Sequence, residues 1–485
     1  MRLLDSAEAS AGSSVPPSIR LDDLLAATGG RLLGTTSVAA FASAAVDSRN
    51  VTPGCCFVAL RGERDDGHRF AAEAVRAGAT VLLVEHPVEV PIGTDVAVVQ
   101  VGDSLNALQE LAAWWRGRSS VRVIGITGST GKTIAKEIVA DVLARTLRVL
   151  RNEGNLNSET GLPMTLLNLA PEHQVAVLEM SMYTEGEIAR LAEIARPEVG
   201  VVLAVHPTHL ERAGSLEAIA RAKAELPAAL PGDGLAVLNA DDPLVAAMKE
   251  ITAARVLTFG LGPEADVRAG DVESHGLAGT SFTLHAPWAI RRLRSATPGR
   301  HLVPHALAAA TVAEHMGVPL DAVEAALAHG SRAPHRMAVV EAAGGATIID
   351  DTYNASPVSV TAALEFLAET PLAPGRHRYA VLGDMLELGP DEERLHREIG
   401  ARTAAVAEAL VAVGERGRWI AEAASAAGLS RVMTARDADD ALVVVERDMA
   451  PGVGDLLLVK ASRGIELDRL VAALTGDHGE RGGRS

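Results

Sequence analysis

A short run of small and hydroxylated residues holds the strongest chemical signal in this 485-residue chain. Residues 127–133 read Thr-Gly-Ser-Thr-Gly-Lys-Thr; the apolar segment Val121–Ile126 precedes them and a helical pattern follows. A glycine-rich turn at such a place lets backbone N–H groups surround phosphate oxygens, and the helix adds its positive N-terminal end. We expect Lys132 to reach the β- and γ-phosphates of a nucleotide and the Thr133 hydroxyl to bind Mg²⁺. The alternative is an ordinary turn between a strand and a helix. The predicted phosphate loop comprises Thr127, Gly128, Ser129, Thr130, Gly131, Lys132 and Thr133.

Three further residues follow this loop in an order that suggests a metal site. Glu179 ends the apolar strand predicted at residues 175–178, His209 follows the strand predicted at 199–205, and Lys223 lies in a helical segment. Ligands of open α/β sheets bind beyond the carboxyl ends of the strands, where Glu179 is placed to hold Mg²⁺. Taken singly, Glu179 could be a surface charge, His209 a structural histidine, and Lys223 a solvated helix residue. Their order after a phosphate loop favours the functional interpretation.

The elements that must position these residues alternate between strands and helices in three stretches. Residues 18–119 predict a small α/β domain, and residues 120–330 predict a parallel sheet covered on both faces. Residues 331–475 repeat the rhythm and are typical of a Rossmann-like domain. We expect disordered tails at residues 1–17 and 476–485. The fold class is therefore α/β, with three domains of which the central one is similar to P-loop ATPases.

Composition and charge exclude several classes of function. The formal net charge of −17 disfavours nucleic acids and anionic membranes as partners. No apolar run reaches the roughly 18 residues that a membrane span requires. The N-terminus lacks the pattern of a signal peptide, and the only cysteines, Cys55 and Cys56, are adjacent. We therefore expect a cytoplasmic protein without a membrane span.

The order of the motifs resembles the Mur ligases, the ATP-dependent amide ligases of peptidoglycan precursor assembly. In that family a comparable loop is followed by a strand-end Glu, a His, and a lysine that is often carbamoylated. The similarity covers about residues 20–475. The segments that carry it outside the loop are Asp47–Arg49, Asp66–His68, Asn155–Asn157, Glu179–Met180, His209–Glu211, Gly214–Ser215, Leu238–Asp242, Asp350–Asn354, Leu382–Gly389 and Lys460–Gly464.

The resemblance implies a ligase with ATP and Mg²⁺ as cofactors and with a carbamate on Lys223. It implies that UDP-N-acetylmuramoyl-tripeptide is phosphorylated to an acyl phosphate and joined to D-alanyl-D-alanine by a monomeric enzyme. The catalytic residues it implies are Lys132, Glu179, His209, Lys223 and Arg336, and the metal ligands are Thr133, Glu179, His209 and Lys223. Beyond the loop, the ATP contacts it implies are His305, Asp351, Tyr353 and Asn354. The substrate contacts it implies are Ser48, Arg49, His68, Asn155, Asn157, Lys460, Ser462 and Arg463.

Several positions depart from the family pattern, and they leave the substrates open. The departures are Ser158, Ala204, His206, His305, Ser356 and Ala461. Four of them, Ser158, Ala204, His305 and Ser356, motivate one alternative, a paralogous ligase of secondary metabolism that joins a different acid and amine. A second alternative is a nucleotide-binding regulator without turnover, against which the retained Lys132, Glu179 and Lys223 argue.

Overall fold

The computed structural model describes residues 18–62, 65–208, 210–330 and 333–476. His209 and the tails predicted at 1–17 and 476–485, apart from Gly476, lie outside these ranges. The chain divides into two compact units, which are described separately. The first comprises the chain up to Val123, Leu147–Met180 and Arg190–Arg196, and the second comprises the rest. The domain boundaries expected after residues 119 and 330 stay predictions.

The first unit contains a five-stranded sheet in the order β2-β7-β6-β5-β4, parallel except for β2. Its core holds Phe57, Leu82 and Val84 from the strands with Ala71 and Ala74 of α2. Strands β1 and β3 form an antiparallel pair, and β9 and β10 a parallel pair. The strands are β1 Ile19–Arg20, β2 Arg31–Leu33, β3 Ala40–Phe41, β4 Ala44–Ala45, β5 Cys56–Val58, β6 Val81–Val84, β7 Ala97–Gln100, β9 Val149–Arg151 and β10 Val175–Glu179. The helices are α1 Leu21–Thr28, α2 Ala71–Ala77, α3 Ser104–Gly117, α5 Gly161–Leu166 and α6 Glu187–Ala195, most of which belongs here.

In the second unit, seven strands of one sheet follow the order β16-β15-β14-β13-β12-β11-β8. The parallel sheet predicted from the apolar strands is present from β8 to β14, but β15 and β16 continue it in antiparallel fashion. The strands are β8 Arg122–Thr127, β11 Val199–Val202, β12 Leu235–Asn239, β13 Arg255–Gly260, β14 Val267–Ser274, β15 Thr280–Ala286 and β16 Ala289–Ser295. The helices are α4 Lys132–Leu143, α7 Leu210–Ala213, α8 Leu216–Ala228, α9 Pro243–Ala246, α10 Val303–His315 and α11 Leu320–His329.

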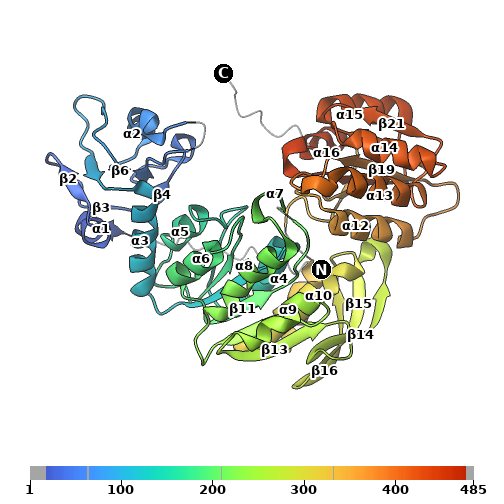
Figure 1. Ribbon diagram of the computed structural model, residues 1–485, viewed down its shortest axis with the longest axis horizontal. Coiled ribbons are helices and arrows are strands. Elements are labelled where there is room, and N and C mark those ends of the chain that lie inside the picture. The colour runs from blue at the N-terminus through green and yellow to red at the C-terminus, as the bar shows by residue number, and fades with distance from the viewer. Residues whose placement is uncertain (1–17, 63–64, 209, 331–332, 477–485) are drawn as a thin grey trace, which may run out of the picture. The chain divides into compact units, whose positions relative to one another are not determined.

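The C-terminal part of the same unit is a doubly wound sheet, coloured orange to red in Figure 1. Its order is β17-β18-β22-β19-β20-β21, parallel except for β17. Apolar residues of α12, α13 and α14 fill one core, and those of α15 and α16 fill another. The strands are β17 Ala338–Glu341, β18 Thr347–Asp350, β19 Arg378–Gly383, β20 Ala409–Val413, β21 Val432–Ala435 and β22 Leu456–Lys460. The helices are α12 Pro357–Glu369, α13 Glu392–Ala404, α14 Gly417–Ala426, α15 Ala438–Val444 and α16 Asp468–Thr475. The Rossmann-like expectation is therefore confirmed.

Within the described residues, none of the helices combines the length and the apolar composition needed to cross a membrane.

Candidate functional site

The predicted phosphate loop connects β8 to α4 in the second unit. Gly131 is the N-cap of α4 with φ 79°, a left-handed conformation that glycine adopts without steric cost, and it leaves the first turn without a side-chain cap. The Lys132 ammonium donates to the Gly128 carbonyl oxygen at 2.7 Å, and Thr133 is buried. The loop thus combines a helix N-terminus, a lysine and a hydroxyl, the groups that hold a nucleotide's phosphates.

His305, at the start of α10, packs against this loop. A Cβ atom at Gly131 would lie 2.0 Å from its Nε2 atom, so the close approach requires glycine. Burial lowers the pKa of His305 to about 4, which makes the ring neutral at physiological pH. Its Nδ1 atom is buried with no hydrogen-bond partner among the described residues. The predicted ATP contact is therefore adjacent to the loop and retains a polar atom that a ligand could use.

Arg336 links the C-terminal part of the unit to the loop. One guanidinium nitrogen, Nη2, donates to Thr133 Oγ1 at 2.8 Å, and the guanidinium carbon lies 3.8 Å from the centroid of the Tyr353 ring. Both neighbours of Arg336 have positive φ angles, 58° at His335 and 54° at Met337. Strained backbone of this kind gathers at functional sites, because the surrounding structure must hold it. The predicted residues Arg336, Tyr353 and Thr133 therefore lie together.

A buried ion pair lies beside the Arg336 segment. The Lys460 ammonium, at the end of β22, pairs with the Asp351 carboxylate and donates to the Asn354 carbonyl oxygen at 2.9 Å. Burial raises the pKa of Asp351, against the lowering effect of the Lys460 and Arg336 charges. Asp351 Oδ1 also accepts the Met337 N–H at 3.3 Å. Through the Asp351–Met337 hydrogen bond, the ion pair thus stabilises the strained backbone next to Arg336.

Two other predicted substrate residues follow β22. Ser462 is buried, and its hydroxyl accepts the Leu386 N–H at 2.9 Å. Arg463 is exposed and pairs with Asp468 at 3.0 Å. Of these two, Arg463 is the more accessible to a substrate.

Lys223 lies on α8 and is 2% exposed, so the solvated alternative for this residue is wrong. Burial, and after it the charge of Lys132, lower the pKa of the Lys223 ammonium well below its ordinary value. A neutral amine is the form of lysine that reacts with CO₂. The lowered pKa therefore favours the neutral, reactive form of Lys223.

In the first unit, Glu179 ends β10 and is 2% exposed. Asn157 donates to its Oε1 atom at 2.6 Å. Asn152, directly after β9, bonds to both backbone groups of Glu179, at 3.0 Å and 3.1 Å. Asn152 is not among the site residues expected from the sequence; the available signal was a polar residue at the end of a short strand. Asn155 is exposed, and its carbonyl oxygen accepts the Asn157 N–H at 2.7 Å.

The residues predicted to bind UDP have different surroundings. His68 Nδ1 contacts Asp66 at 2.6 Å, and its Nε2 accepts the Glu85 N–H at 2.9 Å, so both ring nitrogens are occupied. Its ring stacks on His86 at 4.2 Å. The Ser48 hydroxyl donates to Glu73 at 3.1 Å, and Arg49 is exposed beside Asp47. Arg49 is the most accessible of these groups to an anionic ligand, whereas the ring nitrogens of His68 stabilise the local structure.

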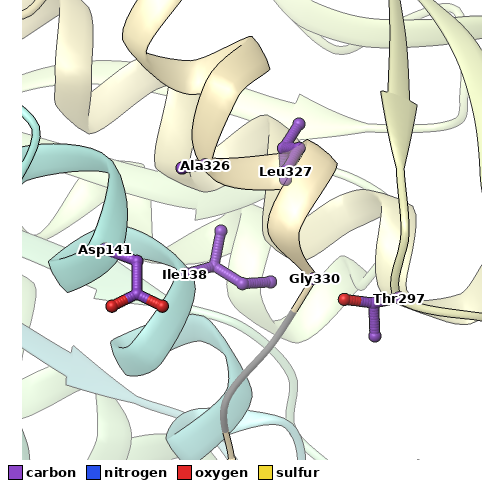
Figure 2. A pocket seen from close by; sticks show the side chains of 6 residues that line it. All are labelled: Ile138, Asp141, Thr297, Ala326, Leu327 and Gly330. Carbon is purple, nitrogen blue, oxygen red and sulfur yellow. The ribbon is translucent and has the colours of Figure 1, made fainter. Parts of the chain in front are cut away.

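Figure 2 shows a small pocket elsewhere in the second unit, between α4 and α11. It is lined by Ile138, Asp141, Thr297, Ala326, Leu327 and Gly330. None of the predicted site residues is among them, so we assign this pocket no part in the chemistry.

Comparison with known families matches three parts of the chain. The Mur ligase middle domain matches residues 126–313, and the Mur ligase glutamate ligase domain matches residues 335–463. The catalytic domain described for the Mur ligase family matches residues 42–116. These matches include the phosphate loop, Glu179, Lys223 and Arg336.

Known proteins resemble the chain over most of its length. A UDP-N-acetylmuramoyl-tripeptide--D-alanyl-D-alanine ligase from Escherichia coli (strain K12) is 38% identical, over 88% of this chain and 92% of the relative. A crystal structure of MurF from Acinetobacter baumannii has a TM-score of 0.82 and 31% identity, covering 95% of this chain and 99% of that one. MurF ligase from Thermotoga maritima in complex with ADP has a TM-score of 0.76 and 30% identity, covering 90% of this chain and 97% of that one.

Proposed function

Because this chain belongs to the Mur ligase family, we propose that it joins UDP-N-acetylmuramoyl-tripeptide to D-alanyl-D-alanine at the expense of ATP. The enzyme is an ATP-dependent ligase that forms a C–N bond. Relatives that cover about nine tenths of the chain carry the name of this reaction, and a similar structure holds ADP. We assign the UDP-linked acceptor to residues 18–119, ATP to residues 120–330, and closure over the reacting groups to residues 331–475.

The observation that carries the proposal is the contact of Arg336 with Thr133 at the phosphate loop, at 2.8 Å. It brings a guanidinium from the C-terminal part to the place where Lys132 and the start of α4 would hold phosphates. Two cations at one loop suit the transfer of a phosphoryl group to another anion, the peptide carboxylate. Lys132 and Arg336 would offset the repulsion between these anions.

The reaction has two steps. The acceptor carboxylate attacks the γ-phosphorus of ATP, which gives an acyl phosphate and ADP. The amine of D-alanyl-D-alanine then attacks the acyl carbon, and phosphate leaves with the electrons of the carbon–oxygen bond. Exclusion of water by the C-terminal part would protect the mixed anhydride from hydrolysis. The base for the amine stays unassigned.

The residues present fit a requirement for Mg²⁺. The Thr133 hydroxyl oxygen already accepts a hydrogen bond from a cation, the Arg336 guanidinium. We propose Thr133, Glu179, His209 and a carbamoylated Lys223 as the groups that hold Mg²⁺. Bound Mg²⁺ would neutralise charge on the phosphates.

We propose ATP contacts from the loop and from His305, Asp351, Tyr353 and Asn354. For the substrates we propose Ser48, Arg49, His68, Asn155, Asn157, Lys460, Ser462 and Arg463. Lys460 acts through Asp351 and Asn354 in this proposal, because its ammonium is bonded to both. His68 acts through the backbone of Glu85, whose N–H it accepts. We further propose a monomeric, cytoplasmic enzyme with small-molecule partners and no nucleic acid.

The proposal is tested by measuring phosphate release from the purified protein with ATP and Mg²⁺. We expect release only when UDP-N-acetylmuramoyl-tripeptide and D-alanyl-D-alanine are both present, because the amine is needed to discharge the acyl phosphate. Mass spectrometry should then find the UDP-linked pentapeptide.

Release with a different acid and amine, and none with this pair, would overturn the substrates and favour the paralogous ligase of secondary metabolism. Nucleotide binding without release for any pair would favour the regulator. The Thr133→Val variant tests the proposed role of the Thr133 hydroxyl, since valine keeps the size of threonine and removes the hydroxyl.

A further inference from the structure

The four residues Leu203–His206, which follow β11, pack behind the phosphate loop. The Leu203 N–H donates to the Thr127 carbonyl oxygen at 3.0 Å, and the Ser129 N–H donates to that of Ala204 at 2.8 Å. The Ser129 hydroxyl donates to the His206 carbonyl oxygen and accepts the His206 N–H, each at 2.9 Å. The position of the loop therefore depends on where this segment lies.

Two side chains, one at the end of β12 and one just after it, hold the same segment from its other side. Asn239 donates to the Leu203 carbonyl oxygen at 2.8 Å, and Asp242 Oδ2 accepts the Val205 N–H at 2.7 Å. The other oxygen of Asp242, Oδ1, accepts the N–H groups of Leu244 and Val245 and so caps α9. The two carboxylate oxygens of Asp242 thus have separate roles: Oδ1 caps α9, and only Oδ2 binds the segment Leu203–His206.

We propose that Asp242 is a positioning residue for the phosphates of ATP, acting on the loop through Val205, His206 and Ser129. The hydrogen bond to Val205 is charge-assisted, which makes it stronger than one between neutral groups. It fixes the backbone at residues 205–206 and therefore the two bonds of the Ser129 hydroxyl. The inference rests on the proposed function, because it assumes that the loop binds ATP.

The variant Asp242→Ser separates the two tasks. Serine is a favoured N-cap, so its single hydroxyl should keep the cap on α9, but it is too short to reach Val205 as well. Asp241→Ser is the matched control, because Asp241 accepts the N–H groups of Leu261 at 2.6 Å and Gly262 at 2.8 Å, whereas Val205 is held by Asp242. The two variants change neighbouring residues in the same way.

We expect Asp242→Ser to weaken ADP binding about 10-fold in calorimetry, the effect of losing one hydrogen bond to a charged acceptor. The KM for ATP should rise by a similar factor, and the KM values for acceptor and amine should not. Amide hydrogen exchange should accelerate at residues 127–133 and 203–206. Asp241→Ser should change none of these. Wild-type affinity and exchange in a folded Asp242→Ser protein would overturn the inference and leave Asp242 as a helix cap.

A double variant guards against general destabilisation. If Asp242 acts through Ser129, then Asp242→Ser combined with Ser129→Ala should bind ADP no more weakly than Ser129→Ala alone. Losses that simply add would overturn the inference. If the unmodified protein and Asp241→Ser both fail to bind ADP, the proposed function falls, and the inference falls with it.

Discussion

Replacing Lys132 with alanine should lower kcat for phosphate release by about 10³-fold, the scale of losing a group that stabilises charge in the transition state. Lys132 is the first residue of α4, and its ammonium is folded back onto the Gly128 carbonyl oxygen within the loop. From that position the ammonium can stabilise the negative charge of the phosphoryl group during its transfer from ATP to the carboxylate. The measurement is the rate of phosphate release with saturating substrates.

The matched control for this prediction is Lys249→Ala, because Lys249 is an exposed lysine after α9, outside the loop. Its rate should equal that of the unmodified protein. Circular dichroism should show that both variants are folded. Equal rates for Lys132→Ala and the unmodified protein would contradict the assignment of the loop.

Replacing Lys223 with arginine should lower kcat by about 10²-fold or more, on the scale of losing one electrostatic group. Burial and the charge of Lys132 lower the pKa of Lys223. Its amine is therefore neutral at pH values where an exposed lysine is still charged, and only the neutral amine adds CO₂. Arginine also has a long basic side chain, but it forms no carbamate.

The direct measurement is carbon-13 NMR of the protein in ¹³C-bicarbonate. We expect a carbamate signal near neutral pH that is lost in Lys223→Arg and kept in Lys249→Arg, since Lys249 is an exposed lysine outside the loop. The signal should weaken as the pH falls below the lowered pKa of Lys223. A fully active protein without the signal would rule out the carbamate and leave the ligase assignment standing.

The loop and the parallel strands could be predicted because their signals are local. The β-branched segment before Gly128 and the helical pattern after Gly131 indicate β8 and α4 directly. Strand β14, by contrast, reads Val-Arg-Ala-Gly-Asp-Val-Glu-Ser, and only two of its residues are buried, Val267 and Ala269. Its pairing with β15 is a long-range property that the sequence pattern does not carry.

The surroundings of the site residues were harder to predict. Lys223 lies among alanines and charged residues, a pattern equally suited to a solvated helix, and only the packing of α8 buries it. Asn152 and Asp242 act on backbone groups that are distant in sequence, so no local spacing identifies them. Burial and backbone hydrogen bonds of this kind depend on the fold.

One departure from the family pattern has a structural explanation. Ser356 is the N-cap of α12, and its side chain and that of Ser359 form a capping box, with Pro357 in the first turn. The family pattern leads us to expect asparagine at this position. Asparagine and serine are both favoured at N-caps, so serine keeps the start of the helix. Ser356 therefore gives little reason to expect a different substrate. His305, which packs against the phosphate loop, is the departure with more direct bearing on the nucleotide.

The transfer of a phosphoryl group to the acceptor carboxylate is tested by labelling that carboxylate with ¹⁸O. If the reaction passes through an acyl phosphate, one labelled oxygen must leave with the phosphate when the amine attacks. Mass spectrometry should therefore find one ¹⁸O in each phosphate released, and only with both substrates present. Unlabelled phosphate, formed together with the amide product, would contradict activation of the carboxylate by ATP.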